Sequence, residues 1–406
     1  MDYFDKSVLR AAFTTRQGLD DAPRWSSVQK AIQQIAAVQI DTISVVARSH
    51  HLTLRNRVKN YHPDHIWDAL RNRQVFEHFA HACCFVPIEE YPYYRYRMKR
   101  FPINNWEKSQ LHKYKDHMYS VEARIRNEGP LSSKDFEDPS EKKRGGFWDW
   151  KPAKQALDLL WQTGRLAVTE RKNFQRVYDL SERVIPSKYF EGHVDKDQVW
   201  RYFMERNLDC LVASTARGLC EYITCGNFAL DMIGNRTKTM ERHLDILEQE
   251  DVVTKISVLN AKSQYYILTR HLPFLHKVQD RRDLASRAWF LNPFDNVLWN
   301  RARVERLFNM KIKLEAYTPP ANRKFGYYVT PILWQHNLIG RIDPKADRPT
   351  GTLILHNVEI DIPPKIISKT IEPIKQELVR FMRFHDLDRI QIERAKPAQL
   401  KTKLAS

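Results

Sequence analysis

One pattern, an amphipathic helix followed by two short strands, recurs along the chain and limits the folds that the chain can adopt. In the clearest copy, Gly164 supplies a C-terminal stop for the helix. Strand-like runs follow at 166–168 and 177–180, and the polar, basic segment 170–173 separates them. The pattern predicts a helix and a β-hairpin, because one helical face gathers five apolar residues: Ala153, Ala156, Leu157, Leu160 and Trp161.

A second copy follows, and a less regular one opens the chain. In the second copy, residues 240–247 form an amphipathic helix, and strand-like runs at 252–259 and 264–268 flank a turn. The opening copy has a helix at 5–18 and then a second helix. The second helix runs into 38–43, where apolar and polar residues alternate as in a strand. Its N-cap candidates and apolar face are Ser26, Ser27, Val28, Ala31, Ile32 and Ile35.

A helix followed by a hairpin is the arrangement of recognition helix and wing in a winged helix-turn-helix unit. We therefore expect an α+β fold, mainly α, with tandem winged helix-turn-helix units and a small antiparallel β-rich C-terminal domain. Strands are expected at 311–317, 326–330 and 353–355, and a helix at about 366–385. The polar stretch 135–146 reads as a loop.

At 406 residues the chain exceeds one hydrophobic core, so several domains are expected. The first winged-helix unit, 1–58, contains the segment with the candidate catalytic residues, and a helical, aromatic-rich connector follows it. Two more winged-helix units, a basic β-rich C-terminal domain with a terminal helix, and a disordered tail complete the expected order. The boundaries after 1–58 are 59–128, 129–190, 191–275, 276–390 and 391–406.

The charge balance indicates a polyanionic partner. The chain has 66 Lys and Arg against 49 Asp and Glu, a formal net charge of +17. Each phosphate that a basic side chain neutralises releases a counterion, which favours binding to nucleic acid. Between residues 281 and 348, thirteen Lys and Arg face six Asp and Glu. Double-stranded DNA is therefore the expected partner, and a basic protein with no such partner is the alternative.

Several classes of protein are disfavoured. None of the 12 glycines forms a phosphate-binding loop or a dinucleotide fingerprint, so no cofactor is expected. The five cysteines lack the paired spacing of a zinc ribbon, and no apolar stretch suggests a signal peptide or a membrane span. A cytoplasmic, nucleoid-associated protein is expected. The pairs His62/His65 and His78/His81 have ligand-like spacing, but packing or hydrogen bonding is favoured over a metal site.

Gln39 and Asp41 are the first candidates for catalysis. Residues two apart in an extended segment point to the same side, so both polar groups would share one face while Ile40 packs inward. A carboxylate and an amide can hold one water, with the Asp polarising it and the Gln fixing its orientation. The Asp can also stabilise positive charge on a sugar ring. From spacing alone, a strand with outward polar residues is the more ordinary interpretation.

Blocks spread over nearly the whole chain resemble the YcaQ/AlkZ family of bacterial DNA glycosylases. The block at 38–54 reads VQIDTISVVARSHHLTL and looks like the signature segment of that family. Further blocks appear in the expected order: 76–81, Arg95 to Met98, 292–295, 299–303, Tyr317 with 323–329, and 340–343.

The resemblance implies a fold, an activity and two catalytic residues. The catalytic motif of the family is Gln-x-Gln or Gln-x-Asp, and here it reads Gln39-Ile40-Asp41, as in the YcaQ branch. That branch removes alkylated purines and unhooks interstrand crosslinks, and the family consists of tandem winged helices. Alkylation at N7 already makes the purine a good leaving group, so one carboxylate and one amide suffice. A crosslinked base cannot swing fully into a deep pocket, which predicts a shallow, open site.

Basic residues near the catalytic segment, at a predicted wing and in the C-terminal region are candidates for phosphate contact. For each of them, a solvated charged surface is the alternative. Arg323 and Lys324 lie between two strand-like runs, where a hairpin tip would probe a groove. Trp148, Trp150 and Trp161 are more readily explained as core residues than as stacking platforms. The candidate DNA-binding residues are Arg48, His50, His51, Arg55, Arg57, Arg171, Lys172, Arg301, Arg303, Arg323, Lys324 and Arg341.

Two other functions remain open. A non-enzymatic winged-helix regulator would need a dimerisation element for a palindromic site, and no heptad repeat is evident. A nuclease would need clustered carboxylates for two metal ions, whereas the acidic residues here are scattered. No lysine stands out as a Schiff-base nucleophile, so the expected enzyme is a monofunctional glycosylase without lyase activity. A monomer is expected.

Overall fold

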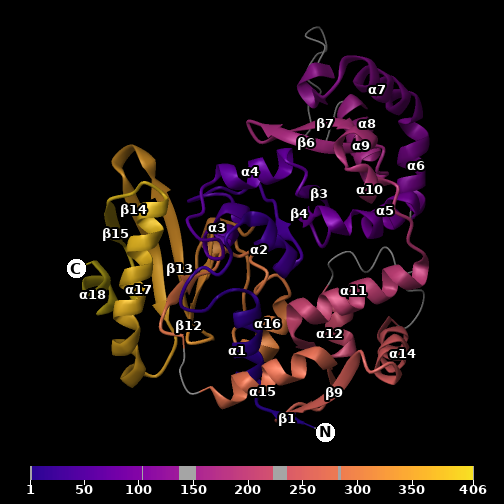
Figure 1. The fold of residues 1–406 in the computed structure, drawn as a ribbon. Coiled ribbons are helices and arrows are strands. Elements are labelled where there is room, and N and C mark those ends of the chain that lie inside the picture. Colours follow the sequence, from indigo (N-terminus) through magenta and orange to yellow (C-terminus); the bar gives the residue numbers. More distant parts are fainter. Residues whose placement is uncertain (1, 103, 137–151, 223–235, 282–284, 406) are drawn as a thin grey trace. The chain divides into compact units, whose positions relative to one another are not determined.

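The computed structural model describes residues 2–102, 104–136, 152–222, 236–281 and 285–405 (Figure 1). Contacts between residues divide the chain into two units. Unit 1 contains residues 1–61, 207–222 and 235–406, and unit 2 contains 62–206 and 223–234. The first and last segments of the chain therefore share one unit. This differs from the expected succession of six segments, because residues near the N-terminus pack into the core of the C-terminal sheet.

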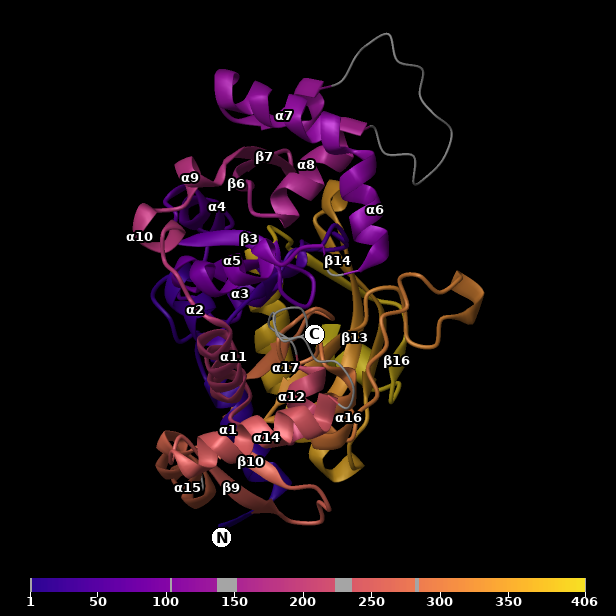
Figure 2. The same ribbon diagram turned by 90° about the vertical axis from the view of Figure 1, so that its right-hand side faces the viewer.

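The largest sheet of unit 1 joins strands from its C-terminal segment. β11 (Ala288–Phe290), β12 (Thr330–Trp334), β13 (Asn337–Asp347) and β14 (Thr352–Ile360) pair antiparallel in that order. β15 (Arg389–Ile392) and β16 (Ala395–Lys396) both pair with β14 in parallel. The expectation of an antiparallel sheet is thus correct only for the first four strands. The long helix α17 (Pro364–Phe384) lies along this sheet, as Figures 1 and 2 both show.

The core of this sheet includes residues from both ends of the chain. Val46 and Leu52 from the N-terminal segment belong to the same buried cluster as the strands and α17. Leu400 and Leu404 of α18 (Leu400–Ala405) belong to the same cluster. The prediction of a disordered tail at 391–406 is therefore wrong for residues 391–405. Two leucines at i and i+4 form a small apolar helix face, a signal too short to detect in sequence.

Three helices precede the point where the chain enters unit 2. α1 (Lys6–Arg16) begins at Asp5, whose side chain accepts a hydrogen bond from the backbone N–H of Ser7. α2 (Val28–Ile35) begins at Ser27, which caps the backbone N–H of Lys30 as the sequence predicts. β2 (Val38–Gln39) is much shorter than the expected strand at 38–43, and α3 (Ser49–Arg55) follows it.

A second sheet of unit 1 has the strand order β1–β9–β10–β8. α14 (Arg236–Gln249) precedes the hairpin of β9 and β10, so this helix and hairpin form as predicted. Their assignment to a winged helix stays a prediction. The elements of this part are β1 (Tyr3–Phe4), β8 (Ala213–Ser214), α12 (Ala216–Glu221), β9 (Val253–Val258), β10 (Tyr265–Leu268), α15 (Leu272–Asp280) and α16 (Arg301–Phe308).

Unit 2 contains the other predicted helix and hairpin. α8 (Pro152–Gln162) is followed by β6 (Leu166–Lys172) and β7 (Gln175–Leu180), with the turn at Asn173 and Phe174. The remaining elements are α4 (Asp64–Arg71), β3 (Val75–Phe79), β4 (Cys83–Pro87), α5 (Tyr91–Lys99), α6 (Asn105–Lys113), α7 (Lys115–Glu128), β5 (Leu131–Ser132), α9 (Ser181–Val184), α10 (Ser187–Phe190) and α11 (Lys196–Leu211), whose last residues belong to unit 1.

The expectation that residues 59–128 are helical is wrong at the antiparallel hairpin of β3 and β4. Most residues of both strands are buried, so apolar and polar residues do not alternate along them. That alternation is the signal by which a strand is recognised in sequence. Residues 137–151 lie outside the described part of the chain. They include most of the expected loop at 135–146 as well as Trp148 and Trp150. Trp161 is a core residue, as predicted.

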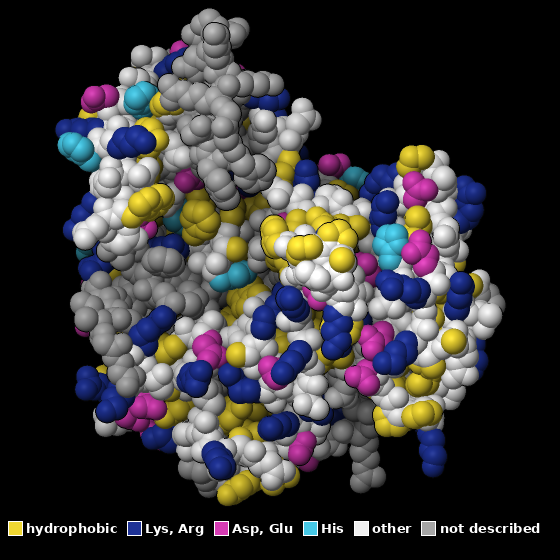
Figure 3. Space-filling model, turned by 180° about the vertical axis from the view of Figure 1, so that it is seen from behind, with side chains coloured by type: hydrophobic (Ala, Val, Ile, Leu, Met, Phe, Trp, Pro, Cys, Tyr) yellow, Lys and Arg dark blue, Asp and Glu magenta, His cyan; other side chains and the backbone are white. Residues whose placement is uncertain are grey.

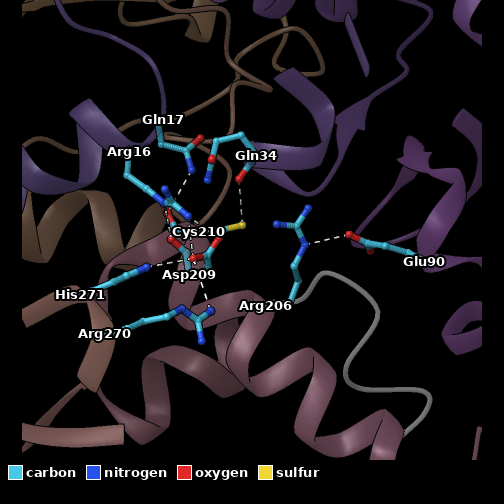
Figure 4. A network of polar contacts seen from close by, with 9 residues as sticks. All are labelled: Arg16, Gln17, Gln34, Glu90, Arg206, Asp209, Cys210, Arg270 and His271. Carbon is cyan, nitrogen blue, oxygen red and sulfur yellow. Dashed lines mark hydrogen bonds and ion pairs between the residues drawn. The ribbon is translucent and has the colours of Figure 1, made fainter. Parts of the chain in front are cut away.

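Ion pairs hold the end of α11 in place (Figure 4). In unit 1, the carboxylate of Asp209 accepts hydrogen bonds from Arg16 at 2.6 and 2.7 Å and lies 3.0 Å from Nε2 of His271. Burial opposes ionisation of Asp209, but hydrogen bonds from His271 and Arg16 outweigh it and hold its pKa well below the usual range. Within unit 2, Arg206 donates to Glu90 at 2.7 Å.

Candidate catalytic segment and basic groove

Hydrogen bonds hold the backbone of the segment that carries Gln39 and Asp41, both at its start and at its short strand. α2 ends at Ala36 in a left-handed conformation, which turns the chain toward β2. The side-chain amide of Asn296 donates to the carbonyls of Ile35 and Ala37 at 2.9 and 2.8 Å. Farther along, the hydroxyl of Ser49 donates to the carbonyl of Gln39 at 2.9 Å. These contacts give the segment a defined backbone although its strand has only two residues.

Burial alternates along this segment in the way that the candidate site requires. Val38 is 0% and Ile40 7% exposed, whereas Gln39 and Asp41 are both partly exposed. One oxygen of Asp41, Oδ1, accepts the backbone N–H of Ile43 at 2.9 Å. No ion pair of Asp41 occurs among the described residues. The joint action of Gln39 and Asp41 on one water stays a prediction.

Tyr328 is a neighbour of Asp41 that the sequence did not single out. Its ring is fully buried, and its hydroxyl has no hydrogen-bond partner in the part of the chain that the structure describes. Burial raises the pKa of Tyr328 far above its usual value, and the negative charge of Asp41 raises it further. A neutral phenol therefore lies near the candidate catalytic carboxylate. Ile43 and Val45 pack against the cluster that contains Tyr328.

The loop at 292–296 connects the candidate segment to the C-terminal part of unit 1. Asn292 donates to the hydroxyl of Thr53 at 2.8 Å. Asp295 binds both terminal nitrogens of Arg57, at 2.7 and 2.8 Å. Together with the amide of Asn296, these contacts hold the chain before β2 and after α3. The block 292–295 and the block 38–54 are therefore in direct contact through Asn292 and Thr53.

A groove in unit 1 brings three of the candidate DNA-binding residues together. Arg301, Lys324 and Arg341 line a cavity of about 950 Å³, and Lys311 and Lys313 line it as well. Three acidic residues also contribute to its wall: Glu305, Glu315 and Asp361. The lysines are exposed, and the groove is therefore a basic surface of suitable size for a phosphate backbone.

Within the described ranges, no group of three or more His, Cys, Asp and Glu residues is arranged to hold a metal ion. The rings of His78 and Trp161 lie 5.0 Å apart, which agrees with the expected packing role of this histidine. Burial lowers the pKa of His78 to about 3, and the charge of Arg97 contributes to the shift. Every described helix is also too short or too polar to cross a lipid bilayer.

A model of the family described as DNA glycosylase AlkZ-like matches residues 32–384. The chain belongs to this family. The DNA glycosylase AlkZ of Streptomyces sahachiroi has a similar fold, with a TM-score of 0.65 over 97% of this chain and 100% of that chain. The two sequences are 12% identical, so this likeness bears on the fold alone. The suspected family is thereby confirmed, and the molecule is a DNA glycosylase of the AlkZ-like family.

In this AlkZ-like protein, several of the arginines predicted to contact DNA are instead part of the interior. Arg57 is fully buried against Asp295, and Arg55 is buried against Glu377 at 2.8 Å. Arg303 donates to the carbonyls of Ala213 and Leu211 at 3.0 and 2.9 Å. Their guanidinium groups are bound inside the fold and are not available to a phosphate.

Three other candidates are corrected because their side chains are also buried or nearly buried. In unit 2, Arg171 binds both carboxylate oxygens of Glu77, at 2.6 and 2.7 Å, and is nearly buried. In unit 1, Arg341 is buried beneath the ring of Phe325, with its guanidinium carbon 3.8 Å from the ring centre. His50 is completely buried. Sequence shows that these side chains carry charge or polarity, but not which carboxylate or ring covers them.

The other candidates keep an accessible surface. Lys172 is largely exposed, and Lys324 is exposed beside the groove. Arg48 and Arg323 are partly exposed. The expected strand at 311–317 is absent, so Arg323 and Lys324 are not the tip of a hairpin. Arg301 is partly exposed but donates to the carbonyls of Leu298 and Pro293, and His51 binds the hydroxyl of Tyr61 at 2.8 Å. A phosphate contact by any of these six residues stays a prediction.

Proposed function

We propose that this AlkZ-like DNA glycosylase hydrolyses the N-glycosidic bond of N-alkylated purines and unhooks interstrand crosslinks. The observation that carries the proposal is the pair Gln39 and Asp41, both partly exposed on a segment whose backbone is anchored by Asn296 and Ser49. Such anchoring supports catalysis because a water must be held close to its productive position.

The chemistry asked of the pair is modest. The bond between C1′ and N9 breaks, and its electrons neutralise the cationic alkylated base as it leaves. Asp41 stabilises the positive charge that develops on the sugar, and it accepts a proton from the water whose oxygen bonds to C1′. Gln39 orients that water. Oδ1 of Asp41 already accepts the N–H of Ile43. The other carboxylate oxygen, Oδ2, is therefore the one that accepts the proton from the water.

The products are a free base and an abasic site, as expected of a monofunctional enzyme. A lyase would need an amine that forms a Schiff base with C1′. The segment from Ala36 to Ser49 contains no lysine. Partial exposure of Gln39 and Asp41 supports a shallow site that accepts a base still tethered to the opposite strand. We also propose that the helix–hairpin elements are winged helices and that the protein acts as a monomer on duplex DNA.

The test is to incubate the purified protein, with EDTA present, on duplexes that carry either N7-methylguanine or a nitrogen-mustard crosslink. Release of free base with formation of alkali-labile sites is the expected result. Release from methylguanine alone would overturn the crosslink part of the proposal. Sequence-dependent binding without product would favour a transcriptional regulator, and strand scission that requires a metal ion would favour a nuclease.

A further inference from the structure

We propose that a cavity within unit 2 is a binding site for a free, uncharged purine base. The cavity has a volume of about 230 Å³ and lies beside the end of β3 and the first turn of α6. A single water needs far less space, so the cavity can take a small organic molecule. The inference deepens the proposed function and rests on it in one respect, since excision of an alkylated purine would supply such a base.

The lining of the cavity contains a buried histidine whose ring nitrogens are not satisfied. His78 is 3% exposed. The backbones of Phe79 and Trp161 lie close to its ring, but neither ring nitrogen makes a hydrogen bond with any described residue. Such a group costs free energy unless a water or a ligand pairs with it. Ala80 is also buried and the other lining residues are partly exposed, so His78 lies at the inner end of a cavity that solvent can enter.

The charges of the lining favour an uncharged ligand. Arg97 and Glu107 contribute one charge of each sign. Burial lowers the pKa of His78 and of His81 to about 3, so both imidazoles are neutral at physiological pH. The lining therefore has no formal net charge, unlike the face drawn in Figure 3, over which many Lys and Arg side chains are spread. A phosphate or a nucleotide would need an excess of cations around it.

Aromatic and hydrogen-bonding groups in the lining select a flat heteroaromatic ring. Phe79 and Phe101 offer rings against which a planar molecule can pack. Each neutral imidazole has one donor and one acceptor nitrogen, and the amide of Gln162, which a hydrogen bond to Asp158 orients, has groups of both kinds. A purine base is flat and uncharged, and donors and acceptors alternate along its edges. A purely apolar ligand would leave His78 unpaired.

The experiment is equilibrium dialysis of the full chain against labelled adenine at pH 8, without DNA. Saturable binding of one adenine per chain is expected, with a Kd below about 1 mM. 3-Methyladenine should displace it, whereas adenosine monophosphate at the same concentration should not. His78→Phe is expected to raise Kd about tenfold, because it removes both ring nitrogens but keeps an aromatic ring against Trp161. The matched control is His62→Phe, at an exposed histidine of unit 2, which should stay within twofold of wild type.

A second substitution keeps the test informative if His78→Phe does not fold. Gln162→Ala, at a partly exposed position, is expected to raise Kd about fivefold. Gln110→Ala, at a partly exposed glutamine outside the lining, is its control. Absence of saturable binding below about 1 mM would overturn the site, and so would equal binding in wild type, His78→Phe and Gln162→Ala.

The competitors test the class of ligand. Displacement by adenosine monophosphate as effective as that by adenine would overturn the uncharged base. Failure of 3-methyladenine to displace adenine would overturn an excised purine as the occupant. None of these measurements depends on base release. A chain that binds adenine through His78 but releases no base from alkylated DNA would refute the proposed function alone, and the reverse result would refute this inference alone.

Discussion

Arg57 and Asp295 form a two-pronged ion pair in which neither side chain reaches solvent. The pair joins the chain just after α3 to the loop that also holds the start of β2. Asp295→Ala leaves a buried guanidinium without its counter-charge. We expect the free energy of unfolding to fall by about 3–5 kcal/mol, measured by urea denaturation. The control is Asp68→Ala, which breaks an exposed pair with Arg71 and is expected to cost less than about 1 kcal/mol.

Asp41→Asn is expected to reduce base release by a hundredfold or more, because an amide neither accepts the proton of water nor stabilises a cationic sugar. DNA affinity, measured by fluorescence anisotropy, stays within about twofold of wild type. Asp386→Asn is the matched control, since Asp386 is exposed and its left-handed backbone suits asparagine. A parallel loss of affinity and activity in Asp41→Asn would mean that Asp41 is structural.

Tyr328→Phe tests whether the hydroxyl of Tyr328 acts on Asp41 or has only a structural role. The hydroxyl is buried without a partner among the described residues, so its removal is expected to leave the free energy of unfolding unchanged or to raise it by about 1 kcal/mol. Base release is expected to fall about tenfold, because the neutral phenol is a polar group near the Asp41 carboxylate. Tyr327→Phe, at a partly exposed ring next in sequence, should change neither quantity. Equal activity in both variants would show that Tyr328 only fills space.

Acid is expected to destabilise unit 2 through His78. Burial, with the charge of Arg97, lowers the pKa of this residue to about 3 from 6.5, so between these values the unfolded chain binds a proton that the folded chain does not. The stability due to neutral His78 is complete above pH 6.5 and is lost as the pH falls toward 3. Between these pH values, the free energy of unfolding falls by up to about 1.4 kcal/mol for each pH unit.

The measurement is the urea midpoint at pH 7 and at pH 5 for the wild type and for His78→Asn. The variant is expected to be less stable at pH 7 but to lose less on acidification. His62→Asn, at an exposed histidine, serves as the control and should keep the wild-type slope. If the urea midpoint of His78→Asn falls between pH 7 and pH 5 as much as that of the wild type, His78 is not responsible for the acid sensitivity.

Leu400→Ala tests the order of the C-terminal helix. Leu400 is completely buried in the cluster that α17 and the large sheet share, so truncation is expected to cost about 2–4 kcal/mol of unfolding free energy. Leu259→Ala, at an exposed leucine of unit 1, should cost less than about 0.5 kcal/mol by the same thermal or urea measurement. Equal stability in the two variants would restore the interpretation of residues 391–405 as a loose tail.

Local patterns in the sequence predicted local structure well. The helix and hairpin at 152–180 and at 236–268 have clear periodicity, and Ser27 carries its own capping signal. Partnerships over long separations were not predictable. Arg57 and Asp295 are 238 positions apart, and any of many carboxylates could have paired with that arginine. A basic residue in a sequence indicates charge but not whether its side chain is buried. For this reason, six of the twelve candidate DNA contacts were predicted on side chains that are buried.

The sharing of one unit by the first and last segments has a consequence for biosynthesis. On the ribosome, Gln39 and Asp41 emerge more than two hundred residues before Asn296, which holds the chain ahead of them. Residues 62–206 of unit 2 form one contiguous range and can complete their own core in the meantime. The candidate catalytic segment must wait without its anchor at Asn296 until about three quarters of the chain has been translated. A prematurely terminated chain would therefore carry Gln39 and Asp41 without the framework that positions them.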